Sequence, residues 1–422
     1  MDIKTALDYL FSLENRGIHL GLGPVTELLE SLGNPHRSLR TIHIAGSNGK
    51  GSVAAMIASI VKRAGYRVGL YTSPHLVCFR ERIRIDGVMI GEDELARLVT
   101  LLRPRVTDEL TFFEVVTALA FLHFQRHSVD VAVIETGLGG RLDATNCVVP
   151  EVSLITTISL EHERYLGRSI SRIAAEKGGI IKEGGICITG ATQKRALDVF
   201  ESIAEERRAR LIRAGRDFAA RRRGEQRISY RGLTRALNDV PLPLAGGYQV
   251  KNAALALASI EILSEKGMTV DDEAIIGGMA SVRWEGRLEI IDRSPLVIVD
   301  GAHNPEGVRA LCRSLKNDFT WERLFVVFGV MRDKRYKTML SLLAAMADTI
   351  IITEPQSGSD RALHLSGRET WLPVGRGTTY ESVPDPEKAM LRARELADEK
   401  DLILVAGSLY LVGAVKRAED RA

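Results

Sequence analysis

Seven residues with the composition of a phosphate-binding loop follow a short apolar stretch at 42–45: Gly46, Ser47, Asn48, Gly49, Lys50, Gly51 and Ser52. Small residues allow backbone N–H groups to surround a phosphate, and a helix that starts there points its positive end at the same place. A helix-like apolar stretch follows at 53–61. The common motif G-x-x-x-x-G-K-[ST] differs in two positions, because Ile44 replaces the first glycine and Ser52 comes one residue late. We predict a nucleoside triphosphate site, with a turn that binds nothing as the alternative.

Three polar side chains follow predicted strands of a parallel sheet. Ser73 comes after the strand at 67–71, Glu135 ends the apolar strand at 129–135, and His162 lies beyond the strand at 153–158. Strand ends of an open parallel sheet line its ligand crevice, and hard cations prefer oxygen ligands. A cation site near the phosphates is one interpretation. A plain turn at Ser73, a surface acid at Glu135 and a structural histidine at His162 stay open.

Two more segments carry groups that could do chemistry. Lys177 lies in a helix-like stretch at 173–179, where it is either a solvated lysine or an amine whose pKa is lowered by burial. Asp300, His303 and Asn304 follow another strand, and Pro305 is typical of a first helical position. This second segment is either a binding edge or an ordinary capped turn.

Alternating strands and helices must position these groups, which predicts an α/β fold. The first 32 residues read as two helices, and helices are expected at 94–102, 113–126 and 252–264. An Arg-rich stretch at 207–235 interrupts the alternation and predicts a solvated, β-rich excursion. A second alternating set starts near Leu296. We therefore predict a parallel-sheet ATPase domain with a P-loop at 1–291, followed by a smaller Rossmann-like α/β domain at 292–422.

Composition limits the classes of partner. The 422 residues carry a formal net charge of only +3, so nothing calls for nucleic acid or a membrane surface. Four scattered cysteines form no C-x-x-C pair and suit a reducing cytoplasm. No secretory signal is visible, and no apolar run approaches the ~20 residues of a membrane helix.

The order and spacing of these segments resemble the Mur ligase superfamily, specifically its folate branch of folylpolyglutamate synthases, often bifunctional with dihydrofolate synthase. The segments that carry the resemblance span nearly the whole chain: 18–22, 46–52, 72–76, 80–82, 111–114, 135–146, 161–162, 166–167, 176–180, 284–287, 300–305, 333–334 and 407–408.

The resemblance implies an ATP-dependent ligase that phosphorylates a carboxylate and joins the acyl phosphate to the amine of L-glutamate. It implies ATP, two Mg²⁺ ions and room for a monovalent cation, with Lys50, His162 and Lys177 as catalytic residues. Mg²⁺ would be held by Ser73, Glu135 and His162, and Lys177 would carry a carbamate. The expected nucleotide contacts are Asn48, Gly49, Lys50, Gly51, Ser52, Asn252, Arg287, Asp300 and His303.

The folate substrate is expected at Thr111, Phe112, Phe113, Glu114, Leu142, Asp143 and Ala144. Residues 140–144 favour the bifunctional type, which also accepts dihydropteroate. Three departures from the family pattern stand out: Glu161 replaces an Asp before the histidine, His19 replaces an Asp, and Arg335 stands where an Asp is common. The expected protein is a cytoplasmic monomer.

Three other functions stay open from the sequence. They are a Mur-type ligase for another carboxylate, a P-loop kinase, and a nucleotide-gated binding protein. A kinase would not need a second αβ domain with the 300–305 segment. A pure binding protein would not need Glu135, His162 and Lys177 together.

Overall fold

The computed structural model describes residues 1–355, 362–363 and 377–419. The described chain divides into two compact units. The first comprises residues 1–75, 79–243 and 250–282, and the second comprises 76–78, 244–249 and 283–422. The predicted division at 291 falls inside a strand of the second unit, β12 (Glu289–Arg293), so this unit begins earlier along the chain.

The first unit is built on an eight-stranded sheet. Along the sheet from β2 through β5, β1, β6 and β7 to β8, every neighbouring pair of strands is parallel. Its strands, in spatial order, are β4 (Val88–Met89), β3 (Ile83–Ile85), β2 (Val68–Tyr71), β5 (Val131–Glu135), β1 (Thr41–Ala45), β6 (Val152–Ile155), β7 (Ile186–Thr189) and β8 (Arg210–Arg213). β1, β5 and β6 are buried along their whole length, as expected of central strands covered on both faces.

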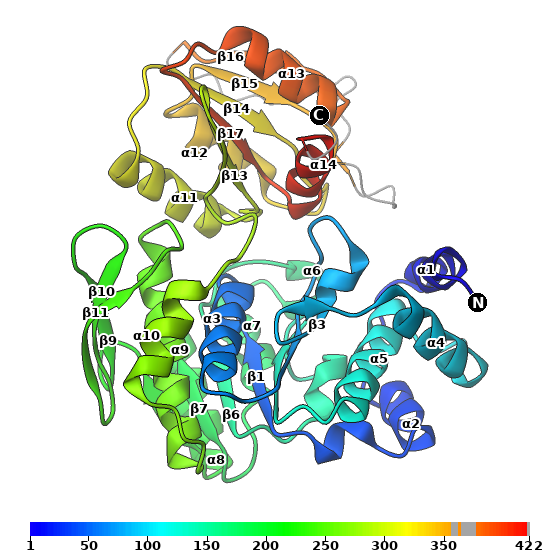
Figure 1. Cartoon of the computed structure of the whole chain (residues 1–422). Helices are drawn as coiled ribbons and strands as arrows, with labels where there is room; N and C mark the ends of the chain where they lie inside the picture. The colour runs from blue at the N-terminus through cyan, green and yellow to red at the C-terminus, as the bar shows by residue number, and fades with distance from the viewer. Residues whose placement is uncertain (356–361, 364–376, 420–422) are drawn as a thin grey trace. The chain divides into compact units, whose positions relative to one another are not determined.

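Helices cover this sheet on both faces (Figure 1). They are α1 (Ile3–Ser12), α2 (Gly23–Ser31), α3 (Lys50–Arg63), α4 (Glu92–Leu102), α5 (Phe112–Arg126), α6 (Glu163–Leu166), α7 (Ile170–Gly178), α8 (Lys194–Glu206), α9 (Tyr248–Glu265) and α10 (Asp272–Ser281). Close backbone packing joins α3 to α10, because Ser59 Oγ donates to Gly278 O at 2.7 Å and a side chain at Gly278 would overlap Ile60.

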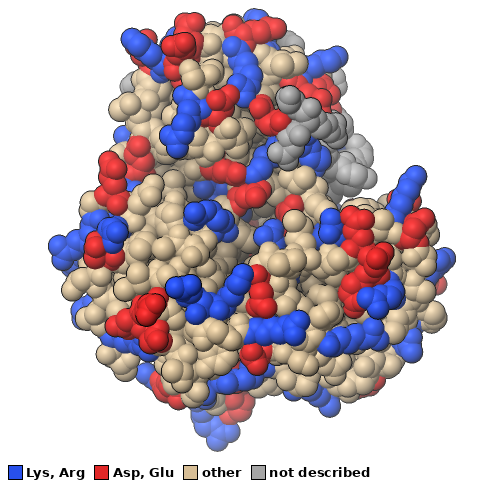
Figure 2. Space-filling view, in the orientation of Figure 1, with Lys and Arg blue, Asp and Glu red and all other residues tan. Residues whose placement is uncertain are grey.

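The predicted β-rich excursion is confirmed. β8 extends the main sheet, and a separate antiparallel sheet follows with β9 (Ala219–Arg222), β10 (Arg227–Arg231) and β11 (Ala236–Pro241). On the face of the molecule drawn in Figure 2, positive and negative side chains are interspersed.

The second unit has a six-stranded sheet in the order β12, β13 (Leu296–Asp300), β17 (Leu402–Ala406), β14 (Leu324–Phe328), β15 (Thr349–Ile352) and β16 (Thr379–Ser382). Among the described strands of this six-stranded sheet, only β12 and β13 pair antiparallel. Side chains alternate across it: Ile298 packs on α11 (Pro305–Asp318) and α12 (Tyr336–Ala344), whereas Val297 and Val299 pack on α13 (Pro386–Leu396) and α14 (Leu409–Glu419). This is the predicted second α/β domain, with an edge strand that the sequence pattern did not reveal.

Among the described residues, no helix is both long enough and apolar enough to cross a membrane.

Candidate active site

The predicted phosphate loop connects β1 to α3, which starts at Lys50 rather than at residue 53. Gly46 and Gly49 have φ values of 143° and 94°, a region that favours glycine. A Cβ at Gly46 would also overlap Thr156, and one at Gly49 would lie 2.5 Å from Asn252 Oδ1. These two glycines are therefore required by the backbone and by close neighbours, whatever they bind.

Hydrogen bonds fasten the loop to the segment that follows β6. Ser47 N donates to Thr157 O at 2.8 Å, and Asn48 N donates to Thr157 Oγ1 at 3.1 Å. In return, Thr156 Oγ1 donates to Asn48 O at 2.7 Å. The loop is thus held in shape before any ligand arrives, which lowers the ordering cost of binding.

Lys50 and Glu135 meet above the end of the sheet. Lys50 Nζ lies 3.8 Å from Glu135 Oε1 and donates to Gly46 O at 3.1 Å. Glu135 ends β5 and is only 4 % exposed, and its Oε2 accepts a hydrogen bond from Ser73 N at 3.3 Å. The structure therefore brings together the loop lysine and two of the three predicted cation ligands.

Lys177 is buried in α7 and reaches the same loop from the other side. Its Nζ donates to Gly46 O at 2.9 Å and forms an ion pair of 2.8 Å with Glu161 Oε1. Burial lowers the pKa of Lys177, although the Glu161 carboxylate partly opposes the shift. Burial also works against ionisation of Glu161, but Lys177 and Lys50 outweigh it and hold the pKa of Glu161 below its usual range.

Glu161 is therefore the ion-pair partner of Lys177, although sequence analysis noted it only as a departure from the family pattern. Gly46 O accepts from both Lys50 and Lys177, so a continuous chain of polar contacts runs from Glu135 to Glu161. The spacing of these residues in the sequence gives no sign of the pair, because Glu161 and Lys177 meet only when α7 packs under the loop.

His162 follows Glu161 and precedes the short helix α6. It adopts a left-handed backbone conformation, with φ 45° and ψ 40°, and its charge contributes to the lowered pKa of Glu161. β6 ends at Ile155 rather than at 158, so an irregular segment at 156–162 connects the strand to α6 and includes His162.

The remaining nucleotide candidates of the first unit surround the loop. Gly51 and Ser52 lie in the first turn of α3, with Ser52 1 % exposed. Asn252, in α9, lies against Gly49.

The other nucleotide candidates gather in the second unit, at the end of β13. Asp300 is 3 % exposed and accepts hydrogen bonds from Leu288 N at 2.9 Å, from Ala302 N at 2.8 Å and from the Tyr248 hydroxyl at 3.2 Å. Burial raises its pKa, while Arg287 acts in the opposite direction.

Arg287 and His303 flank the glycine that follows Asp300. A Cβ at Gly301 would overlap Arg287, and His303 Nδ1 donates to Gly301 O at 2.9 Å. Pro305 begins α11, as predicted, and Asn304 caps it by accepting from Gly307 N at 2.8 Å.

The predicted folate residues are divided between loop supports and an aromatic surface. Glu114 accepts from Thr111 N at 2.7 Å in a capping box at the start of α5. Asp143 is fully buried and accepts from Leu138 N and from Thr145, and Ala144 lies in the core. Leu142 is half-buried beside them. These polar atoms hold the loops in shape.

Phe112 and Phe113 lie at the start of α5, next to aromatic side chains that sequence analysis did not single out. Phe113 packs beneath Gly137, where a Cβ would lie 2.5 Å from the ring. Phe11 stacks on Phe112, with centroids 6.0 Å apart and planes at 13°. Phe11 is 37 % exposed, so the stack has one open face.

A second group completes this aromatic surface. Phe79 lies edge-on to Phe11 at 6.0 Å, and the Arg82 guanidinium lies 5.2 Å from the centre of the Phe112 ring. Arg82 Nε donates to His75 Nδ1 at 2.9 Å. Flat rings with one exposed face and a buried cation suit a planar, anionic or carbonyl-bearing ligand.

The two other departures from the family pattern lie in other segments. His19 is exposed in the connection before α2, and Arg335 precedes α12 in the second unit.

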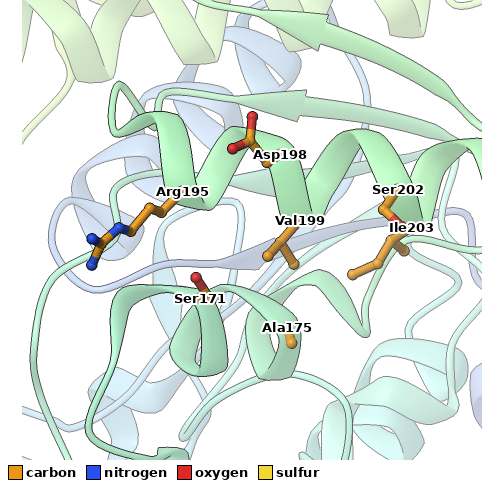
Figure 3. A pocket seen from close by; sticks show the side chains of 7 residues that line it. All are labelled: Ser171, Ala175, Arg195, Asp198, Val199, Ser202 and Ile203. Carbon is orange, nitrogen blue, oxygen red and sulfur yellow. The ribbon is translucent and has the colours of Figure 1, made fainter.

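A hollow of about 340 Å³ lies elsewhere, between α7 and α8. Figure 3 shows Val199 and Ile203 pointing toward α7, whereas Asp198 points away from it and Arg195 extends to one side. None of the predicted site residues lines it, and Lys194 binds Asp198 at its rim. It has no evident part in the chemistry of the loop.

Comparisons with known proteins agree with this geometry. Residues 44–260 match the Mur ligase middle domain, and residues 286–409 match the Mur ligase glutamate ligase domain. The dihydrofolate synthase/folylpolyglutamate synthase of Bacillus subtilis is 36 % identical over 419 residues, which cover 95 % of each chain.

Solved structures show the same likeness. Mycobacterium tuberculosis folylpolyglutamate synthase complexed with ADP matches with a TM-score of 0.92 and 34 % identity, over 100 % of this chain and 99 % of that one. Escherichia coli FolC in complex with DHPP and ADP matches with a TM-score of 0.90 and 31 % identity, over 100 % and 98 %. The resemblance inferred from the sequence is confirmed: the chain belongs to the folylpolyglutamate synthase and dihydrofolate synthase branch of the Mur ligase family.

Proposed function

We propose that this protein is an ATP-dependent ligase that adds L-glutamate to folates, and also to dihydropteroate, through an acyl phosphate. Relatives named for both activities support the substrates, and the nucleotide in the related structures supports ATP. The observation within this chain that carries the proposal is the buried convergence of Lys50, Glu135, Lys177 and Glu161 on the phosphate loop.

The chemistry requires two stages because a carboxylate oxygen is a poor leaving group. Transfer of the γ-phosphoryl group of ATP to the substrate carboxylate makes phosphate the leaving group. The amine of glutamate then attacks the acyl carbon, phosphate leaves, and the amine loses a proton. Loop N–H groups and Lys50 are suited to hold the phosphates and to offset the charge that develops during transfer.

The donor set around the loop fits magnesium. Glu135 offers a buried carboxylate that accepts from the backbone N–H of Ser73, and the side chains of Ser73 and His162 carry a hydroxyl and an imidazole. Oxygen ligands next to phosphates are what Mg²⁺ prefers. When bound, Mg²⁺ would offset the negative charge of the phosphates. The protein's own part is to hold the Glu135 carboxylate near Lys50 and to exclude water from the buried side of the loop.

Lys177 is proposed to carry a carbamate, formed when its amine adds to CO₂ and releases a proton to water. A neutral amine is the form that reacts with CO₂, and burial lowers the pKa of Lys177 in that direction. The product would place an anion beside Glu161, so a cation would be needed to hold the two together. The ion pair of Lys177 with Glu161 is then the resting arrangement of the unmodified chain.

Arg287, Asp300 and His303 of the second unit stay proposed nucleotide contacts. Domain limits of 1–291 and 292–422, a monomeric state, a cytoplasmic location and a bound monovalent cation also stay predictions.

Phosphate release from ATP tests the proposal when it is measured with and without L-glutamate, and in each case with and without a pteroate or folate acceptor. Release from ATP should require both L-glutamate and a pteroate or folate acceptor, and dihydropteroate and tetrahydrofolate should each support it. Release or phosphorylated product without any amine would favour a kinase. Nucleotide binding with no release under any condition would favour a binding protein.

A variant pair separates the loop from the acceptor site. Lys50→Met should abolish release with every acceptor, because it removes the charge facing the phosphates. Phe112→Leu should raise the KM for the acceptor and leave the affinity for ADP unchanged, since the ring lies in the aromatic surface and not at the loop. Equal effects of both variants on ADP binding would contradict these assignments.

A further inference from the structure

A second group of ligand atoms lies in the first unit, on helices α4 and α5, which pack against each other (Figure 1). It comprises Glu94, His123 and His127, and one ligand atom from each lies within 4.8 Å of the other two. The two histidines are four residues apart, so they share one face of α5. No step of the proposed ligase chemistry uses these side chains.

Each of the three side chains is oriented by its surroundings. His123 is 5 % exposed, and its Nδ1 is buried without a hydrogen-bond partner among the described residues, 3.9 Å from Glu94 Oε1. A buried polar atom that lacks a partner costs free energy, so its retention calls for an explanation. An ion bound between Nδ1 and the carboxylate would satisfy it.

His127 is already set in the form that binds a metal. Its ring lies 4.3 Å from that of His123, and its Nδ1 donates to His123 O at 3.0 Å. Donation from Nδ1 leaves the lone pair on Nε2, and metal-bound histidines are typically fixed by this kind of bond to a backbone carbonyl.

Charges of both signs surround these three side chains. α5 ends at Arg126, so its negative end lies at His127 and attracts a positive ion. Arg97 holds the other oxygen of Glu94, and Arg67 is the second guanidinium nearby. Arg97 is 73 % exposed and Arg67 is exposed, so water screens much of their repulsion.

We propose that Glu94, His123 and His127 bind a divalent transition-metal ion, with Zn²⁺ as the best fit. Two imidazoles and one carboxylate form a three-ligand set that Zn²⁺ accepts, with water in the fourth position. A tetrahedral ion with bonds of 2.0–2.1 Å requires ligand-atom separations of about 3.3 Å, so the three side chains would close in from separations of at most 4.8 Å when it binds.

The ion would join the first turn of α4 to the last turn of α5. The folate candidates at 111–114 lie at the opposite end of α5, roughly 14 Å from His123 at 1.5 Å per residue. The site is therefore separate from the proposed active site, and its role would be to stabilise the helix pair. This inference holds whichever carboxylate the ligase accepts.

Metal titration of the full chain tests the site. The protein is stripped with EDTA, desalted and titrated with Zn²⁺ by calorimetry and with Co²⁺ by visible absorption, in excess Mg²⁺ so that oxygen-rich sites are occupied. We expect one tight equivalent, a Co²⁺ spectrum of a tetrahedral complex, and a melting temperature raised by Zn²⁺.

Three variants identify the ligands. Glu94→Gln and His127→Gln should weaken Zn²⁺ binding by more than about tenfold and abolish the tetrahedral Co²⁺ spectrum. Asp93→Asn is the matched control, since it removes the same charge from an exposed neighbour on α4 and should bind as the wild type does. Melting in EDTA shows that each variant is folded.

Two outcomes would overturn the proposal. One is the absence of a tight Zn²⁺ equivalent in the wild-type chain. The other is binding that Glu94→Gln and His127→Gln leave unchanged, which would assign the ion to another part of the protein.

Discussion

The ion pair between Lys177 and Glu161 gives the sharpest test of how the site is built. Both side chains are almost fully buried, with 3 % and 5 % of their surface exposed, and Nζ lies 2.8 Å from Oε1. At an effective dielectric constant of 20, a pair at this distance attracts by about 6 kcal/mol. Desolvation of two ions costs several kcal/mol each, so the net contribution of the pair to stability is small.

Removing one partner should nevertheless be expensive. Glu161→Leu leaves a buried lysine whose Nζ retains Gly46 O, and Lys177→Met leaves a buried carboxylate. Each change should lower the free energy of unfolding by about 3–5 kcal/mol. The double variant removes both charges and should lie within about 2 kcal/mol of the wild type, which gives a coupling energy of at least about 4 kcal/mol.

Urea denaturation in CO₂-depleted buffer measures this cycle. All three tryptophans follow residue 282 in the sequence, so fluorescence reports the second unit while far-UV circular dichroism includes the first. The exposed pair of Lys194 and Asp198 on α8, at 3.2 Å, is the matched control and should show a coupling of only about 0.3–0.5 kcal/mol. Single-variant effects that simply add in the double variant would refute the pair as described.

Three further predictions concern single residues. Lys177→Ala should abolish turnover, and short carboxylic acids should partly restore it by supplying the missing anion; full activity in the untreated variant would refute the carbamate. Gly46→Ala should weaken ADP binding at least tenfold in calorimetry. At φ 143° the new methyl group would overlap Thr156, which introduces strain of about 1–3 kcal/mol. Gly33→Ala is the control: at φ 79°, with no atom near its Cβ, it should leave the ADP affinity unchanged, and equal affinities in both variants would contradict the argument. Burial, with a smaller effect of Lys182, lowers the pKa of His43 to about 3, so the unfolded chain takes up the proton first as the pH falls. The free energy of unfolding should therefore decrease as the pH is lowered below about 6.5, by up to about 1.4 kcal/mol per pH unit. His43→Gln should remove that part of the slope in denaturation measured from pH 7 to pH 5, and an unchanged slope would show that His43 does not titrate in this way.

Much of the fold and part of the site follow from local sequence. The phosphate loop was predicted because its strand, glycines, lysine and helix are consecutive, and the backbone conformations of Gly46 and Gly49 depend on nearby chain. Glu135 was placed correctly for a similar reason, since a buried strand must end where its carboxylate emerges. The short edge strands β12 and β16 were missed because half-exposed edges carry little apolar pattern.

Contacts between distant segments were decided only by tertiary structure. The pairing of Glu161 with Lys177 depends on how α7 packs beneath the loop, and the stacking of Phe11 on Phe112 joins α1 to α5. The same holds for Glu94 and the histidines of α5. Sequence periodicity tells which face of a helix is buried, but it carries no information about which side chain of another element lies opposite. Hydrophobic packing sets those neighbours, and through them the charges that each polar group meets.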